Sequence, residues 1–171
     1  MISTLICSSC GYRSSDVIPL TDRPPRRYIK EVSDKDGLLV RVIRSSTSTV
    51  RIPEFGLRID PGSANDGYIT NIEGVLTRVM SIISQIIRDL SMHPEQFEDS
   101  SERMAKALSL KTTIETILDD ESEEFTKFTV IIEDPNGNSA LVSEIDDVSV
   151  EDLTQKEILD LLGGIYVDND D

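Results

Sequence analysis

Cys7 and Cys10 are the two cysteines of the chain, and their spacing is suited to metal chemistry. Two serines separate the thiols, and Gly11 follows them at once. A tight turn of this kind lets both thiolates point at one metal ion, as in one half of a zinc ribbon. A closed structural zinc site has four ligands, and this pair supplies two of them. The spacing therefore predicts half of a zinc site at Cys7 and Cys10.

A redox-active dithiol is an alternative interpretation of this pair. Such a dithiol needs its first cysteine at the start of a helix, which lowers the thiol pKa. The residues on both sides of Cys7 and Cys10 have the composition of strands instead. A vestigial turn that has lost its metal is the third interpretation. Half a zinc ribbon is the one that we favour.

Catalytic arrangements lack their residues in this sequence. An iron oxygenase site would need two histidines and a carboxylate, and His93, beside Pro94, is the sole histidine. We expect His93 to lie in a solvated loop or at a helix cap. The sequence also contains no nucleophile elbow and no phosphate-binding glycine loop, so we expect that the protein is not an enzyme.

The chain is strongly acidic, and its charge is unevenly distributed. Its 171 residues include 17 Lys+Arg and 32 Asp+Glu, which gives a formal net charge of −15. Residues 1–60 have a net charge of +3 and residues 61–171 a net charge of −18. Such a balance disfavours nucleic acid and can steer a basic partner toward the acidic half. The apolar runs are too short to cross a bilayer and the start lacks a secretory signal, so we expect a cytoplasmic protein.

Strands and turns dominate the first 66 residues. Residues 1–20 predict a strand, the cysteine turn and a second strand, and the prolines in residues 21–27 predict a connector. Short β-branched runs at residues 37–45, 48–52 and 54–59 predict strands of an antiparallel sheet. The segment 60–66 predicts a turn.

Two helices are predicted in the middle of the chain. Thr70 and Glu73 have the spacing of a capping box, and apolar residues recur from Ile72 to Leu90 at helical spacing. A second periodic run covers residues 100–119, so the two form a helical hairpin. The apolar face of the first helix is unusually wide, so it is either core on two sides or partly exposed for binding. Its widest part includes Ile82, Ile83, Ile86 and Ile87.

The last third of the chain predicts strands again and then a short helix. Residues 125–145 predict a β-hairpin around the turn Asp134-Pro135-Asn136-Gly137. A short helix ends at Gly163, and residues 168–171 are expected to fray. Because no βαβ alternation is present, the element order predicts a sandwich or roll with a helical excursion.

Four segments together carry a family resemblance, namely residues 7–17, 51–63, 67–79 and 128–141. In this order the sequence resembles the ZPR-type zinc-finger family, in the form of its single-copy archaeal members. The resemblance implies a mainly β fold with α, in which half of a zinc ribbon precedes a jelly-roll-like double-stranded β-helix with a helical hairpin insertion. The expected units are residues 1–22 for the incomplete zinc-ribbon knuckle and residues 23–171 for the sandwich, with the hairpin at about 70–120.

The resemblance also implies a cofactor and a partner. The family binds zinc through four cysteines and binds translation elongation factor 1-alpha, a GTPase, which it helps to fold or assemble. Cys7 and Cys10 match the second cysteine pair of the family, and the first pair would lie upstream. We therefore expect that the chain was started late, at an internal methionine. Loss of zinc, or a metal held between two chains, are the alternatives.

Polar residues that match the family motifs are the candidate partner-binding set. Each of them also has a sufficient structural explanation as a cap, a turn or a strand junction, so both interpretations stay open. An RNA-contacting accessory protein of translation or transcription is the alternative function, and it would use Arg13, Arg23, Arg26 and Arg27. The candidate partner-binding residues are Arg51, Glu54, Thr70, Glu73, Asp134, Asn136, Asn138 and Ser139.

Overall fold

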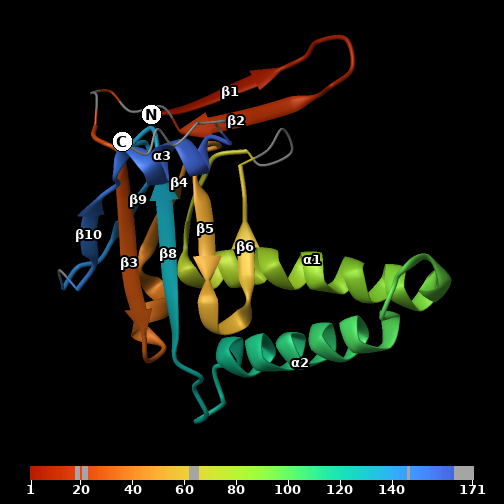
Figure 1. Cartoon of the computed structure of the whole chain (residues 1–171). Helices are drawn as coiled ribbons and strands as arrows, with labels where there is room; N and C mark the ends of the chain where they lie inside the picture. Colours follow the sequence, from red (N-terminus) through yellow and green to blue (C-terminus); the bar gives the residue numbers. More distant parts are fainter. Residues whose placement is uncertain (18–19, 21–22, 62–65, 146, 164–171) are drawn as a thin grey trace, which may run out of the picture.

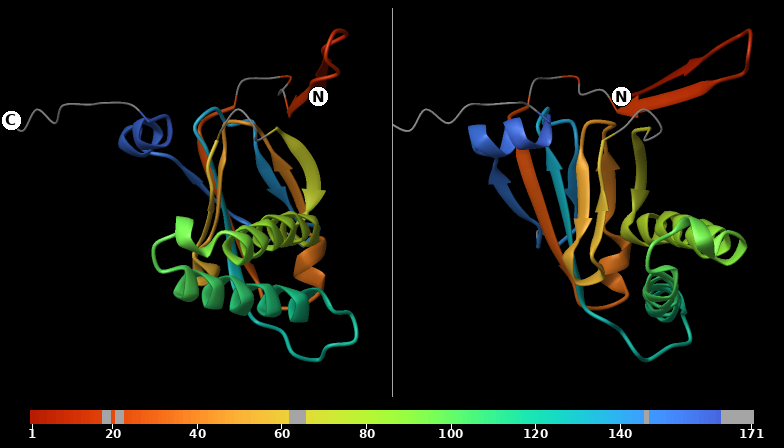
Figure 2. Two further views of the ribbon diagram at one scale, coloured as in Figure 1. Left: turned by 90° about the vertical axis from the view of Figure 1, so that its right-hand side faces the viewer. Right: turned by 45° about the vertical axis from the view of Figure 1, so that its right-hand side comes forward.

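Two antiparallel β-sheets face each other and form a sandwich, with two long helices at one end and a β-hairpin projecting from the other (Figure 1). This computed structural model describes residues 1–17, 20, 23–61, 66–145 and 147–163. The two further views show that the helices lie beneath the sandwich and extend beyond one edge of it (Figure 2). The turn expected at residues 60–66 lies partly outside the described residues, and the expected frayed end at 168–171 lies wholly outside them.

The larger sheet has five strands in the order β10-β3-β8-β5-β6. Burial along β3 alternates, with Tyr28, Lys30 and Val32 buried between more exposed neighbours, as the period of two in a strand requires. Its strands are β3 (Arg26–Val32), β5 (Thr49–Ile52), β6 (Leu57–Ile59), β8 (Phe128–Asp134) and β10 (Ser149–Asp152).

The smaller sheet has three strands in the order β7-β4-β9. The chain crosses repeatedly from one sheet to the other, for example from β3 to β4, from β6 to β7 and from β8 to β9. This alternation is typical of a jelly roll and confirms the predicted fold class. The strands of this sheet are β4 (Arg41–Arg44), β7 (Tyr68–Asn71) and β9 (Ala140–Val142).

The predicted β-hairpin around Asp134 is wrong. The turn itself is present, but β8 and β9 belong to different sheets. Both edges of β8 are already paired, one with β3 and the other with β5. The chain after the turn therefore crosses the sandwich, and β9 pairs with β4 instead.

Two other expectations for the first half also need correction. Arg26 and Arg27 are not part of a connector, because β3 begins at Arg26 and pairs from there with the end of β8. The strand expected from residue 37 begins at Arg41 and is preceded by a 3-10 helix, η1 (Asp36–Leu39). That helix forms because the Asp34 carboxylate accepts the Gly37 N–H at 2.9 Å, an interaction that favours a turn over a strand.

The two long helices confirm the predicted helical hairpin, which is inserted between β7 and β8. The helix α1 (Ile72–Met92) packs on the open end of the sandwich, and α2 (Ser100–Leu118) packs against α1. A 3-10 turn, η3 (Pro94–Gln96), connects them. Among the described residues, no helix combines the length and apolarity that a membrane span requires.

The hydrophobic core is continuous from the space between the sheets to the helical hairpin. Phe128 lies at its centre and contacts the rings of Phe55 and Phe125, with centroids 5.2 and 6.3 Å away. Burial of apolar side chains of this kind supplies the main favourable free energy of folding. The most buried residues are Val32, Val42, Val50, Ile52, Ile72, Val75, Leu76, Ile114, Ile117, Phe128, Val130 and Ile132.

The two ends of the described chain lie at the same end of the sandwich (Figure 1). The N-terminal hairpin consists of β1 (Ile2–Ile6) and β2 (Arg13–Val17). The short helix α3 (Gln155–Leu161) follows β10 and is succeeded by Gly163 in the left-handed conformation at φ 67°, as predicted. Its capping box is Thr154 with Glu157.

Candidate functional site

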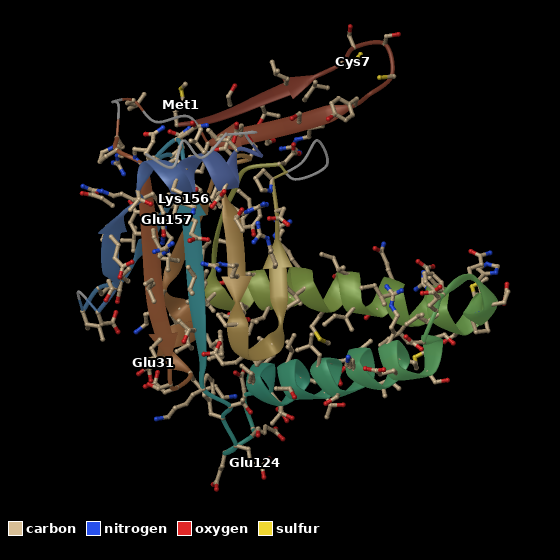
Figure 3. All side chains as sticks on the ribbon, in the orientation of Figure 1. Met1, Cys7, Glu31, Glu124, Lys156 and Glu157 are labelled. Atoms are coloured by element: carbon tan, nitrogen blue, oxygen red, sulfur yellow. The ribbon has the colours of Figure 1, made fainter. Side chains whose placement is uncertain are left out.

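The thiol pair occupies the tip of the β1–β2 hairpin, where Cys7 points away from the sandwich (Figure 3). The turn is closed by the Gly11 N–H, which donates to the Cys7 carbonyl at 2.9 Å, and by the Cys7 N–H, which donates to the Tyr12 carbonyl at 2.8 Å. Gly11 has φ 72°, a conformation that favours glycine. Strands therefore flank both cysteines, and no helix starts at Cys7.

The electrostatics of this turn favour a thiolate at Cys7. Hydrogen bonds from the backbone of Cys10, from the backbone of Ser9 and from the Cys10 side chain lower the pKa of Cys7 below its usual value. Thiolates that accept backbone N–H groups in a tight turn are suitable ligands for zinc. The two cysteines therefore fit two corners of a tetrahedral zinc site.

Further ligands for a metal are not found near the pair within the described ranges. Both thiols are exposed, and no group of three or more His, Cys, Asp and Glu side chains in those ranges could hold a metal ion. His93 lies far from them in the chain, at the end of α1, where its N–H donates to the Asp89 carbonyl at 2.9 Å. This agrees with the expectation that His93 is a solvated cap residue.

Asp134 and Ser139, two of the predicted partner-binding residues of the 134–139 turn, belong to a buried polar cluster. Asp134 is 0% exposed, and its carboxylate accepts hydrogen bonds from Ser45 Oγ at 2.8 Å and Ser139 Oγ at 2.7 Å. It also accepts the backbone N–H groups of Asn136 and Asn138, both at 2.9 Å. Asp134 and Ser139 therefore hold the turn against the loop after β4, while the Asn136 side chain remains exposed.

Gly137 lets this turn approach the chain before β3. Its φ is 67°, and an added Cβ would lie 2.5 Å from the Pro24 carbonyl oxygen and 2.6 Å from that of Arg23. Both contacts are with backbone atoms, which cannot move out of the way as a flexible side chain could. The turn therefore requires glycine at this position.

Glu54 lies toward the other end of β8, whereas Arg51 pairs with Ile131 in the middle of that strand and reaches the residue next to Asp134. Arg51 Nη2 is 2.9 Å from a Glu133 carboxylate oxygen. The Glu54 carboxylate accepts the Thr129 N–H at 3.0 Å and the Thr129 hydroxyl at 2.8 Å, and these hydrogen bonds lower its pKa against the opposing effect of burial. Thr129, which binds Glu54, precedes Asp134 by five residues in β8, so these two positions of the strand are roughly 16 Å apart. The predicted set therefore does not form one compact site.

The predicted capping box of Thr70 and Glu73 is wrong. Thr70 lies in β7, where it pairs with Val42, and the N-cap of α1 is Asn71, whose side-chain oxygen accepts the Gly74 N–H at 2.8 Å. Asn71 pairs with Arg41 at the end of β7 and is extended, so the helix begins one residue later than expected. A capping box is present instead at Thr154 and Glu157, where none was predicted although the sequence has the required spacing.

Arg26 and Arg27, two of the four arginines proposed for RNA contact, are paired with carboxylates. Arg27 lies within 2.6 Å of Glu133, 3.2 Å of Glu151 and 2.6 Å of Glu157, and Arg26 lies 3.5 Å from Asp152. These hydrogen bonds raise the pKa of Arg27, although burial opposes them. Arginines that are already neutralised in this way give little support to RNA binding.

An apolar groove of about 820 Å³ lies between the β5–β6 turn and the helical hairpin. Of the wide apolar face of α1, Ile83 is buried, while Ile82 and Ile86 remain 48% and 42% exposed. The wide face thus serves as core on one side and borders the groove on the other. The apolar periodicity in the sequence predicted the α1 residues of this groove, but not its residues from the β5–β6 turn and from α2. The apolar lining consists of Phe55, Leu57, Ile59, Val79, Ile82, Ile83, Ile86, Ala107 and Leu110.

Comparisons with known proteins give this geometry a context. Residues 36–160 match the ZPR1 jelly-roll domain. A ZPR1-like protein of Pyrococcus horikoshii is 39% identical over 167 residues, which cover 98% of this chain and 70% of that protein. A ZPR1-like protein of Methanocaldococcus jannaschii is 36% identical over 165 residues, which cover 96% of this chain and 76% of that protein.

A eukaryotic relative matches over a smaller share of its own length. A zinc finger chaperone of Schizosaccharomyces pombe is 31% identical over 148 residues, which cover 82% of this chain and 29% of that protein. The jelly roll with its helical hairpin is thus the part that this chain has in common with much longer proteins.

Proposed function

The chain belongs to the ZPR1 family, and from this premise we propose that it is a cytoplasmic, non-enzymatic protein that binds translation elongation factor 1-alpha and helps this GTPase to fold or assemble. The name of the fission yeast relative, a zinc finger chaperone, supports a role in folding another protein. Within this proposal the chain is a single-copy archaeal member of the family. Residues 1–22 serve as its metal-binding module and residues 23–171 as the scaffold.

The observation that carries the proposal is the apolar groove beside the helical hairpin. Ile82 and Ile86 line it and are 48% and 42% exposed on α1. Burying about half of an isoleucine side chain contributes about 1 kcal/mol, so a few such residues together can anchor a protein partner. The groove offers room for an apolar segment of an incompletely folded partner.

The acidic charge of the chain, away from the groove, supports selection of a basic partner, whereas the groove itself is lined by Arg58, Arg103 and Lys106 beside Glu54. Five carboxylates follow the end of α2 within residues 119–124, and Glu124 lies at the opposite end of the molecule from Cys7 (Figure 3). Clustered acidic groups accelerate association with a basic surface and do so less at high salt. Among the predicted partner-binding residues, Glu54 lines the groove and is the one that we place in contact with the partner. The others act by fixing the turns and strand ends around the scaffold.

Zinc enters the proposal through Cys7 and Cys10. These two thiolates would hold the ion together with two ligands from outside the set that the structure describes, and the ion would fix the conformation of the hairpin tip. The β1–β2 hairpin projects from the sandwich at the end opposite the helices, so a partner held by both modules would span the long dimension of the protein (Figure 1).

Calorimetric titration of the chain with purified elongation factor 1-alpha from the same organism tests the proposal. We expect binding, and we expect Ile82→Glu or Ile86→Glu to weaken it about a hundredfold, because each substitution removes an apolar anchor and places a carboxylate in the groove. The matched control is Val150→Glu on β10, a residue that is 49% exposed at the opposite edge of the larger sheet. Absence of binding, or equal weakening by the control, contradicts the proposal.

A further inference from the structure

A second cavity, which shares Ile59 and Ile82 with the groove, lies where the N-terminal hairpin meets the smaller sheet and α1. Its volume is about 510 Å³. Three arginines from three different elements line it, namely Arg13 of β2, Arg44 of β4 and Arg78 of α1. Ser15, Asp66 and Tyr68 add polar groups, and Ile59 and Ile82 form an apolar wall. We call it the arginine pocket.

Arg44 is the buried member of this set. It is 1% exposed, which is unusual for an arginine that has no carboxylate partner among the described residues. Its Nη2 donates to the Ser48 carbonyl at 3.2 Å, and its Nε is buried without a hydrogen-bond partner among the residues that the structure describes. The guanidinium carbon also lies 5.5 Å from the centre of the Tyr68 ring. A buried cation with an unused donor group points to an anion that completes its surroundings.

The other two arginines are free to turn toward the same anion. Arg13 and Arg78 are exposed, and neither forms an ion pair within the described part of the chain, although the protein has a net charge of −15. Arg78 stacks on the other side of the pocket, with its guanidinium carbon 4.4 Å from the Tyr68 ring centre. Burial raises the pKa of Tyr68, and the two arginines oppose this effect. The hydroxyl therefore stays protonated and can donate a hydrogen bond to an oxyanion.

Contacts of Ser14, Ser15 and Asp16 fix the strand β2 next to the sandwich. The Gly67 N–H donates to the Ser15 carbonyl at 2.9 Å, and Ser14 Oγ donates to the Asp66 carboxylate at 3.0 Å. Asp16 accepts both the Ser46 N–H at 3.0 Å and the Ser46 hydroxyl at 2.7 Å. Arg13 is therefore placed by a tethered hairpin, even though its side chain is exposed.

We infer that the arginine pocket binds the phosphate group of a small molecule. Among the described lining residues, three guanidinium groups and the carboxylate of Asp66 leave a charge of +2, which complements a phosphate dianion better than a carboxylate. Guanidinium groups also bind phosphate oxygens in bidentate fashion. The cavity exceeds what the ion alone would fill, and its remaining wall at Ile59 and Ile82 is apolar, so a phosphate ester suits it better than free phosphate.

Titration of the whole chain with three probes at constant ionic strength tests this inference, with binding measured by calorimetry. The probes are inorganic phosphate, phenyl phosphate and benzoate. We expect both phosphates to bind, and tighter binding of phenyl phosphate assigns the site to an ester, whereas equal binding assigns it to the free ion. Benzoate has the same ring but a single charge, so binding of benzoate as tight as that of phenyl phosphate overturns the inference.

Variants of exposed residues locate the binding without disturbing the fold. Arg78→Gln and Arg13→Gln should each weaken phosphate binding about tenfold, because each removes a charge-assisted hydrogen bond. The matched control is Arg88→Gln, an equally exposed arginine on the same helix outside the pocket, which should leave the affinity unchanged. Asp66→Asn should strengthen binding, since it removes the one negative charge. Equal weakening by Arg88→Gln, or the absence of phosphate binding, overturns the inference.

Discussion

The buried carboxylate of Asp134 gives the sharpest test of how the sandwich is held together. Its two oxygens accept five hydrogen bonds, three on Oδ2 from Ser45, Asn138 and Ser139 and two on Oδ1 from Thr47 and Asn136. Two of the donors are backbone N–H groups of the turn that carries the chain from one sheet to the other. The substitution Asp134→Asn keeps the shape of the side chain but turns one oxygen into an N–H donor.

The magnitude follows from what the new amide can and cannot accept. If the amide oxygen takes the place of Oδ2, which accepts three hydrogen bonds, the NH₂ group takes the place of Oδ1. It then faces the Asn136 N–H, which cannot accept a hydrogen bond, and the Thr47 hydroxyl, which can rotate to accept one. One buried donor without a partner costs about 1–3 kcal/mol, and the remaining bonds lose their charge assistance. Relief from burying a charge opposes these costs. We expect a net loss of about 2–4 kcal/mol in the free energy of unfolding.

Urea unfolding followed by circular dichroism measures this loss as a shift of the midpoint at constant slope. The matched control is Asp152→Asn, whose side chain is 81% exposed and lies 3.5 Å from Arg26, so it should change the free energy by less than about 1 kcal/mol. If Asp134→Asn costs no more than this control, the hydrogen bonds at Asp134 do not hold the turn, and the reasoning is refuted.

Two further predictions concern titratable groups at opposite parts of the chain. Hydrogen bonds from the Thr154 hydroxyl, the Thr154 N–H and Arg27 lower the pKa of Glu157 from 4.5 to about 2, so the stability that this carboxylate contributes is complete above pH 4.5 and is lost as the pH falls toward 2. The midpoint of thermal unfolding of Glu157→Gln should therefore lie below that of the parent at pH 7 and converge with it near pH 2, and a constant difference contradicts the prediction. Because its pKa is lowered, Cys7 should react with iodoacetamide at pH 7 faster than Cys10, which peptide mass spectrometry can measure. Zinc should protect both thiols from the reagent. Faster reaction of Cys10 contradicts this prediction.

Patterns confined to a few neighbouring residues predicted their local structure well. The periodic apolar residues of 72–90 predicted α1, and the Cys7–Gly11 segment predicted a tight turn between strands. Both depend on contacts within about four residues, which a sequence window contains in full.

Interactions between distant segments account for two of the predictions that were wrong. The sequence at 70–73 allows either Thr70 or Asn71 to cap α1, and pairing of Asn71 with Arg41, which keeps Asn71 extended, decides for Asn71. The turn at Asp134 was predicted, but the occupation of both edges of β8 decided that β9 joins the other sheet. Neither outcome depends on the residues next to the turn or the cap.

The sequence alone determined the family motifs, the thiol pair, the helical hairpin and the acidic charge, because each is a property of residue type and short spacing. The tertiary structure alone decided that Arg13, Arg44 and Arg78 line one pocket and that Phe55 faces Ile82 and Leu110 across a groove. These residues come from strands and helices far apart in the chain, and what brings them together is the burial of a core shared by both sheets and the helices.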